Sequence, residues 1–206
     1  MVIGGFMQYL KDEVRNRIVY EALREFKNKG YKGASIRIIA NSSNTSVGNL
    51  YKYFSSKEDL YENLIGSVYK RLMDYISEIN SVKINDEAEH IFYNLLNKIM
   101  EIFKENSIEL AILLNKSEGS KYENCKSTFA DFITRIVSQT MEYELHLKGM
   151  RLKDNFIIYL LSCNLVEDMA VILNQQEDGD RIRKLILDII DIFFNNILDK
   201  LDCENI

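Results

Sequence analysis

The 206-residue chain contains no proline and only nine glycines. Proline is least tolerated inside helices, so a chain without it can be helical along most of its length. A β-sandwich or barrel needs repeated turn signals, and nine glycines are too few to supply them. Hydrophobic residues make up 47% of the chain, which is enough to bury the core of one large domain or two small ones. We therefore predict an all-α protein.

Apolar spacing and capping signals divide the chain into nine expected helices. Ser55 with Glu58, and Ser120 with Glu123, form capping boxes that open the fourth and seventh helices. Asn44 lies in the turn between the second and third, where an asparagine tolerates positive φ. The expected helical ranges are 10–29, 35–43, 46–54, 57–80, 87–105, 107–116, 120–149, 154–174 and 180–201.

Charge is distributed unevenly along the chain. Residues 1–70 contain 11 Lys and Arg against 7 Asp and Glu, whereas the remaining residues contain 15 against 24. A basic first third on an acidic body indicates that the N-terminal part meets a polyanion. The alternative is a solvated basic face without a partner.

Cysteine usage and hydropathy bear on the compartment. Cys125, Cys163 and Cys203 are an odd number of widely spaced cysteines, as is typical of reduced intracellular thiols. The N-terminus has no signal-peptide pattern, and no run of 18 apolar residues is free of charge. We therefore expect a cytoplasmic protein with no membrane partner.

The second and third expected helices have the pattern of a helix-turn-helix. A tight turn joins them, and the small residue Ala40 lies where they cross. In such a pair the second helix presents its outward residues to the major groove of DNA. Leu50 and Phe54 face inward here, and the outward residues are Ser46, Val47, Asn49, Tyr51, Lys52 and Tyr53. The alternative is a generic three-helix core whose exposed face carries any polar residues.

Two runs of residues in this region match a known pattern. They are Gly30-Tyr31 followed by Ile36-Arg37-Ile38-Ile39-Ala40, and Ser46-Val47-Gly48-Asn49-Leu50-Tyr51-Lys52-Tyr53-Phe54-Ser55-Ser56-Lys57-Glu58-Asp59-Leu60. Over about residues 11–62 the chain resembles the DNA-binding domain of the TetR/AcrR family of transcriptional regulators. The resemblance implies a nine-helix TetR-like fold. A three-helix helix-turn-helix domain would occupy residues 1–56, and a helical ligand-binding and dimerisation domain residues 57–206.

By position, the resemblance implies that a set of residues contacts double-stranded DNA: Arg37, Ser46, Val47, Asn49, Tyr51, Lys52, Tyr53 and Lys57. Asn49 is the expected base reader, because an amide can bond an adenine edge bidentately. Lys57, in the first turn of a helix, opposes the helix dipole, which favours a phosphate opposite it. Asn44 replaces the family's usual turn glycine, Thr45 replaces its usual valine, and Val47 stands where a polar or basic residue is commoner.

Two helices near the C-terminus are too apolar for one subunit to cover. Fourteen of the 18 residues from Phe156 to Leu173 are hydrophobic, and the helix over 180–201 is apolar around much of its circumference. In TetR-like proteins these two helices pair with their mates as a four-helix bundle, which implies a homodimer. The expected interface residues are Ile190, Phe193, Phe194 and Ile197. The alternative is that both helices are core.

The resemblance also implies a small, largely apolar effector bound among the middle helices. Its candidate contacts are Met100, Phe103, Leu113, Phe129, Phe132, Tyr159 and Cys163. Such stripes are otherwise typical of plain core.

No catalytic motif, metal site or cofactor site is visible. The chain lacks a P-loop, a Gly-x-Ser-x-Gly elbow and a His-Glu-x-x-His pair. We therefore expect no enzyme, and the resemblance implies a DNA-binding repressor that an effector releases from a pseudo-palindromic operator. The alternative is a constitutive regulator without an effector, acting through a protein partner.

Overall fold

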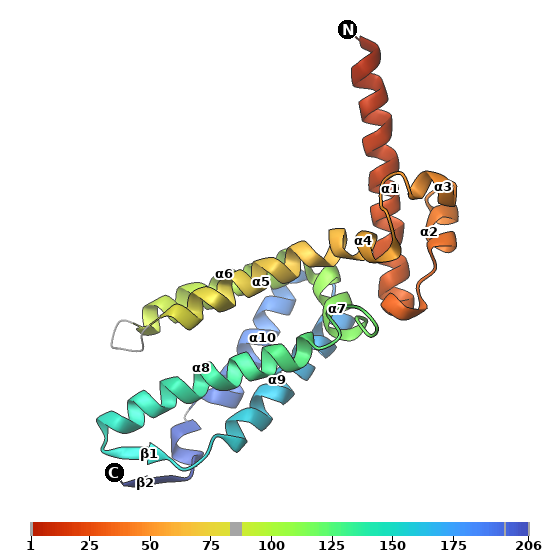
Figure 1. Cartoon of the computed structure of the whole chain (residues 1–206). Coiled ribbons are helices and arrows are strands. Elements are labelled where there is room, and N and C mark those ends of the chain that lie inside the picture. Colours follow the sequence, from red (N-terminus) through yellow and green to blue (C-terminus); the bar gives the residue numbers. More distant parts are fainter. Residues whose placement is uncertain (1, 83–87, 196, 206) are drawn as a thin grey trace. The chain divides into compact units, whose positions relative to one another are not determined.

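A computed structural model describes residues 2–82, 88–195 and 197–205. The elements are α1 (Val2–Gly33), α2 (Ile36–Ser42), α3 (Val47–Leu50), α4 (Lys57–Tyr61), the π-helical η1 (Glu62–Gly66), α5 (Ser67–Ser81), α6 (Ala88–Glu105), α7 (Ser107–Asn115), α8 (Cys125–Leu147), β1 (Met150–Leu152), α9 (Phe156–Gln175), α10 (Gly179–Phe194), the 3₁₀ turn η2 (Ile197–Lys200) and β2 (Cys203–Asn205) (Figure 1). Because α4, η1 and α5 run on without a break, the described residues contain the nine predicted helices. The all-α class is confirmed.

The chain forms two compact units. The first comprises residues 1–69 and 108–123, and the second comprises residues 70–107 and 124–206. The boundary predicted after residue 56 therefore differs from the one observed. The physical reason is that Leu60 and Tyr61, beyond that boundary, are fully buried with the first three helices.

A single apolar core holds the first unit together. Ile18, Ala22 and Phe26 lie four residues apart on α1 and are fully buried, as a helix with one apolar face requires. The Tyr61 ring packs edge-on against Phe26, with 4.9 Å between ring centroids, and against Tyr31 at 4.8 Å. Because α4 supplies this ring, the start of the long helix is part of the N-terminal core.

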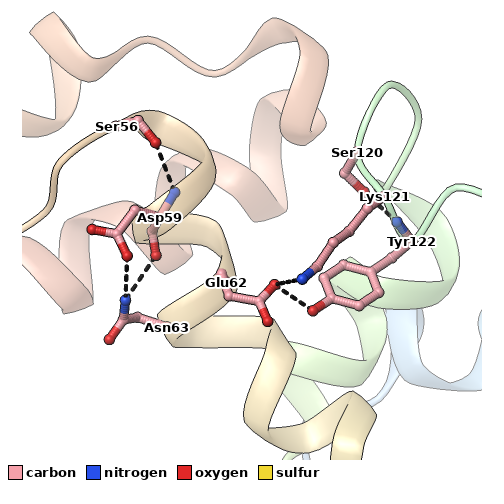
Figure 2. Close-up of polar contacts among 7 residues, drawn as sticks. All are labelled: Ser56, Asp59, Glu62, Asn63, Ser120, Lys121 and Tyr122. Atoms are coloured by element: carbon pink, nitrogen blue, oxygen red, sulfur yellow. Dashed lines mark hydrogen bonds and ion pairs between the residues drawn. The ribbon is translucent and has the colours of Figure 1, made fainter.

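A turn far along the chain joins the same unit through polar contacts. The Tyr31 N–H donates to the Lys116 carbonyl (2.8 Å), and the hydroxyls of Tyr61 and Ser117 lie 2.8 Å apart. Figure 2 shows Glu62 of η1 accepting a hydrogen bond from the Tyr122 hydroxyl and pairing with Lys121, whose Nζ lies 2.7 Å from Glu62 Oε2. These contacts attach residues 116–122 to α1, α4 and η1.

Neither predicted capping box caps its helix as expected. The cap of α4 is Ser56, whose Oγ accepts from the Asp59 N–H at 3.0 Å (Figure 2). Ser120 and Glu123 lie in a turn: the Ser120 Oγ accepts from the Tyr122 N–H (3.1 Å), and α8 begins only at Cys125. A Ser-x-x-Glu spacing also fits a tight turn, so the spacing alone does not locate the helix start.

The second unit is built on α8 and α9, which pack along each other, with α10 against α6 and α9. The predicted last helix does not reach residue 201. Asn195 has an extended backbone (φ −66°, ψ 127°) and ends α10; η2 and β2 follow. β2 pairs antiparallel with β1, Leu152 opposite Cys203. This bend buries Ile197 and Leu201 with Ile158 of α9.

Among the described residues, α9 is the one helix that is long and apolar enough, by length and composition alone, to cross a membrane. It carries only two charged residues, Glu167 and Asp168, so the expectation that no segment could do so is too strong for this helix. The core helix of a soluble protein passes the same test. In this structure α9 packs against α8 and α10.

A candidate DNA-binding surface

The turn between α2 and α3 has the geometry predicted for it. Asn44 adopts the left-handed conformation (φ 52°) just after α2. Its N–H donates to the Asn41 carbonyl (3.1 Å), and the Thr45 N–H donates to the Ala40 carbonyl (2.9 Å). These are the two hydrogen bonds of a Schellman motif, which satisfies the last carbonyls of a helix and fixes the path of the chain beyond it.

The recognition segment, residues 46–53, follows this turn. Ser46 caps α3, and its Oγ accepts from the Asn49 N–H at 3.1 Å. The α-helix is shorter than predicted, ending at Leu50, and residues 51–53 continue it as turns. Leu50 and Phe54 are buried as predicted, so they anchor the segment to the core.

Contacts from α1 hold the helix-turn-helix from behind. Arg17 Nε donates to the carbonyl of the buried Ser43 at 3.3 Å, while its guanidinium pairs with Glu13 at 3.0 Å. The guanidinium of Arg15 lies 5.5 Å from the centre of the Phe54 ring, within the range of a cation–π contact. The sequence does not single out Arg15 or Arg17, because Phe54 and Ser43, which they contact in the helix-turn-helix, lie more than 25 residues away.

The residues expected to contact DNA lie on α2 and on the recognition segment. Exposed among them are Arg37, Ser46, Tyr51 and Lys52, and half-buried are Val47, Asn49 and Tyr53. Within the described part of the chain, the side chains of Arg37 and Lys52 make no hydrogen bond or ion pair. Both cations are therefore available to an external anion such as a DNA phosphate.

Lys57 differs from the other cations. Its ammonium donates to the carbonyls of Ala34 (2.8 Å) and Lys32 (3.3 Å) and lies 4.9 Å from the centre of the Tyr31 ring. Burial lowers the pKa of Lys57, against the opposing effect of the Glu25 carboxylate, which raises it. The carbonyls near the end of α1 thus supply the partners for this cation, and its position does not require a phosphate.

The residues expected to contact an effector are divided between the two units. Leu113 lies on α7 in the first unit, and the others lie on α6, α8 and α9 in the second. Met100, Phe103 and Phe129 are buried, whereas Tyr159 is 41% exposed. Ser138 of α8 was not predicted: its hydroxyl is buried and has no hydrogen-bond partner among the described residues.

The residues expected at the dimer interface differ in how far their own chain buries them. Ile190, Phe193 and Phe194 are half-buried on α10. Ile197 retains only 2% of its exposure, because it packs with Ile158 and Leu201 in the core of its own chain. It is therefore not available to a partner, and its assignment to an interface is corrected. The exposed large apolar side chains of α9 and α10 are Phe156, Ile157, Tyr159, Leu160, Val171 and Ile192.

Residues 18–64, which span the end of α1, the whole helix-turn-helix and the start of the long helix, match the family described as bacterial regulatory proteins, tetR family. This part of the chain is therefore similar to the DNA-binding region of TetR-family regulators. The match covers the core and the recognition segment described above.

Relatives extend the likeness beyond this region. One relative is the biofilm operon icaADBC HTH-type negative transcriptional regulator IcaR of Staphylococcus aureus. The two chains are 29% identical over 146 residues, which cover 69% of this chain and 76% of IcaR. The fold is that of a TetR-family transcriptional regulator from Bordetella parapertussis (TM-score 0.62, 14% identity, 90% of this chain and 96% of that one). It is also that of NalD of Pseudomonas aeruginosa, the secondary repressor of the MexAB-OprM multidrug efflux pump (TM-score 0.51, 17% identity, 93% and 96%). The sequence relative and both structural neighbours are transcriptional regulators.

Proposed function

We propose that this chain is a TetR-family repressor that binds a pseudo-palindromic DNA operator as a homodimer and that a small, largely apolar effector releases it. The observation that carries the proposal is the surface formed by α2 and the recognition segment: contacts from α1 hold it in place, and it carries the exposed cations Arg37 and Lys52 and the amide of Asn49. The sequence relative IcaR is a negative regulator, which supports repression as the role of this chain.

Contacts within the surface divide by chemistry. Arg37 and Lys52 would bind phosphates, and the hydroxyls of Tyr51 and Tyr53 would help to fix the position of the protein on the duplex. Asn49 would read a base edge, and the half-buried Val47 would touch a thymine methyl group. Phosphate contacts provide affinity without sequence information, so specificity would depend on Asn49 and Val47.

The homodimer is supported by apolar surface on two neighbouring helices. Phe156, Leu160 and Val171 of α9 and Ile192 of α10 remain exposed in a single chain. Exposed apolar surface gathered on two adjacent helices is typical of an interface. A second copy would cover it by burying on the order of 800 Å² per protomer. Two-fold symmetry in the protein then requires two-fold symmetry in the operator.

The effector is supported by the interior of the second unit. Met100, Phe103 and Phe129 provide apolar surface there, and Ser138 provides a buried hydroxyl without a partner in the described residues. A buried unpaired hydroxyl is costly unless something bonds it. An effector with an apolar body and one polar group would satisfy that requirement.

Selection from random duplexes, followed by sequencing, tests the DNA-binding part of the proposal. The expected result is an enriched inverted repeat whose half-sites lie about 34–36 Å apart, or a multiple of that distance. A direct repeat, or no enriched sequence at all, would contradict it.

Release of the selected duplex tests the effector part. A panel of small molecules, each with an apolar body and a single hydroxyl or carboxyl group, is added to the complex while fluorescence anisotropy is recorded. At least one is expected to release DNA from the parent and to be less effective on the Ser138→Ala variant. If none changes the anisotropy, the protein acts without such an effector.

A further inference from the structure

We propose that Thr45 is a positioning residue for base recognition, because its hydroxyl fixes the amide of Asn49 in the orientation that selects adenine. This inference rests on the proposed function, since it assumes that Asn49 meets a base. The observation behind it is a hydrogen bond of 2.8 Å from Asn49 Nδ2 to Thr45 Oγ1.

Thr45 is itself held rigidly. Its N–H is bonded to the Ala40 carbonyl, and Asn44 before it is fixed in the left-handed conformation. Ser46 after it is the cap of α3. The Thr45 side chain is also β-branched, so few rotamers are open to it. The Oγ1 atom therefore has a fixed place at the start of the recognition segment, where it accepts from Asn49 Nδ2.

The bond to Thr45 restricts what Asn49 can offer to DNA. A free asparagine amide can turn over and exchange its carbonyl with its NH₂ group, so it can face either a donor or an acceptor pattern. When one N–H is held by Thr45, the second N–H and the carbonyl Oδ1 remain. A donor beside an acceptor matches the N7 and N6 groups of adenine in the major groove.

The side-chain bond is not needed to hold the turn. The Schellman bonds of Asn44 and Thr45 and the cap bond from the Asn49 N–H to Ser46 involve backbone N–H groups that a change at the Thr45 side chain leaves in place. Removal of the Thr45 hydroxyl should therefore affect the orientation of the amide more than the path of the chain. Preorganising a binding group in this way improves discrimination because less freedom is given up on binding.

Thr45→Val removes the acceptor and keeps the shape of the side chain, whereas Thr45→Ser keeps the acceptor and serves as the matched control. Binding is measured on three duplexes: the operator selected by the parent, a changed operator and a scrambled duplex. The changed operator carries a symmetric base change in each half-site, at the position where the Asn49→Ala variant no longer distinguishes one base from another. Thr45→Val is expected to lower discrimination between the first two duplexes by about threefold to tenfold per half-site. Its binding to the scrambled duplex should stay within about twofold of the parent. Thr45→Ser should retain most of the discrimination.

Two further measurements make the result decisive. In the Asn49→Ala background, Thr45→Val should cause no additional decrease in discrimination, because the amide that it positions is gone. A merely structural role would instead lower the melting temperature of Thr45→Val and weaken binding to all three duplexes alike. That outcome, or unchanged discrimination by Thr45→Val, would overturn the inference. If the parent selects no operator, it is the proposed function that fails.

Discussion

At the scale of single residues, polar partners distant in sequence decide what a charged side chain does. The left-handed conformation of Asn44 could be predicted from the chemistry of asparagine, because a positive φ is a local property of the residue. The role of Lys57 could not, because the carbonyls of Lys32 and Ala34 come within its reach only after the first unit has folded. Glu62 is a similar case, bonded to Tyr122 and Lys121, which lie about 60 residues further along.

Glu62 leads to a prediction about pH. Burial alone would raise the pKa of Glu62, but hydrogen bonds from Lys121 and Tyr122 and the charge of Lys121 outweigh it, so the pKa lies below the ordinary value of 4.5. A carboxyl whose pKa is lowered by folding stabilises the protein above its unfolded pKa and ceases to do so as pH falls through the folded one. Glu62→Gln should therefore lower the melting temperature at pH 7, and the difference from the parent should vanish at the acid end of a series from pH 7 to 3.

A matched control for this series is Glu142→Gln, which removes one negative charge from an exposed position on α8. It should leave the melting temperature nearly unchanged throughout. A pH-independent deficit in Glu62→Gln would show that packing, and not the charge, is what Glu62 contributes.

At the scale of elements, periodicity predicted most helices, and their ends depended on particular residues. The first helix was expected to stop at Gly30, and the chain is non-helical there (φ 71°, ψ 170°). Two features could not be predicted from spacing. The π-helical turn η1 includes Gly66, where an added Cβ would lie 2.6 Å from Glu62 Oε1, and the β1–β2 pair depends on a bend after Phe194.

Gly30→Ala should destabilise the protein, because an L-residue rarely adopts this positive φ. The expected cost is about 1–3 kcal/mol, measured by urea unfolding. Gly33→Ala is the matched control: its φ is not positive, and its Cβ would make an ordinary contact with Lys29 at 3.6 Å. Equal midpoints for the two variants would mean that residue 30 does not hold this positive φ in solution.

At the scale of the whole molecule, the resemblance of residues 11–62 predicted the family, and the apolar helices predicted a dimer. The sequence could not show which apolar residues remain available to a partner. Ile197 and Ile192 have the same chemistry, yet the bend after α10 buries the first, while Ile192 stays 68% exposed. Residues 108–123 likewise join the first unit through contacts that no local pattern encodes.

Ile192→Glu should dissociate the dimer, since a carboxylate would be desolvated in an apolar interface. Sedimentation at micromolar concentration should show a dimer for the parent and a monomer for the variant. Leu147→Glu, at an equally exposed position at the end of α8, is the control and should remain dimeric. A monomeric parent would contradict the proposed assembly.

The most direct test of DNA recognition by residues 46–53 is a salt titration of binding to the selected operator and to a scrambled duplex, with Lys52→Ala and Asn49→Ala beside the parent. Lys52→Ala should weaken binding to both duplexes and flatten the slope of log K against log salt by about one unit for each phosphate that the variant no longer neutralises. Asn49→Ala should leave the slope and the scrambled duplex unchanged and cost about 1–3 kcal/mol on the operator at one symmetric pair of positions. If both variants bind as the parent does, this face is only the solvated outside of a three-helix core.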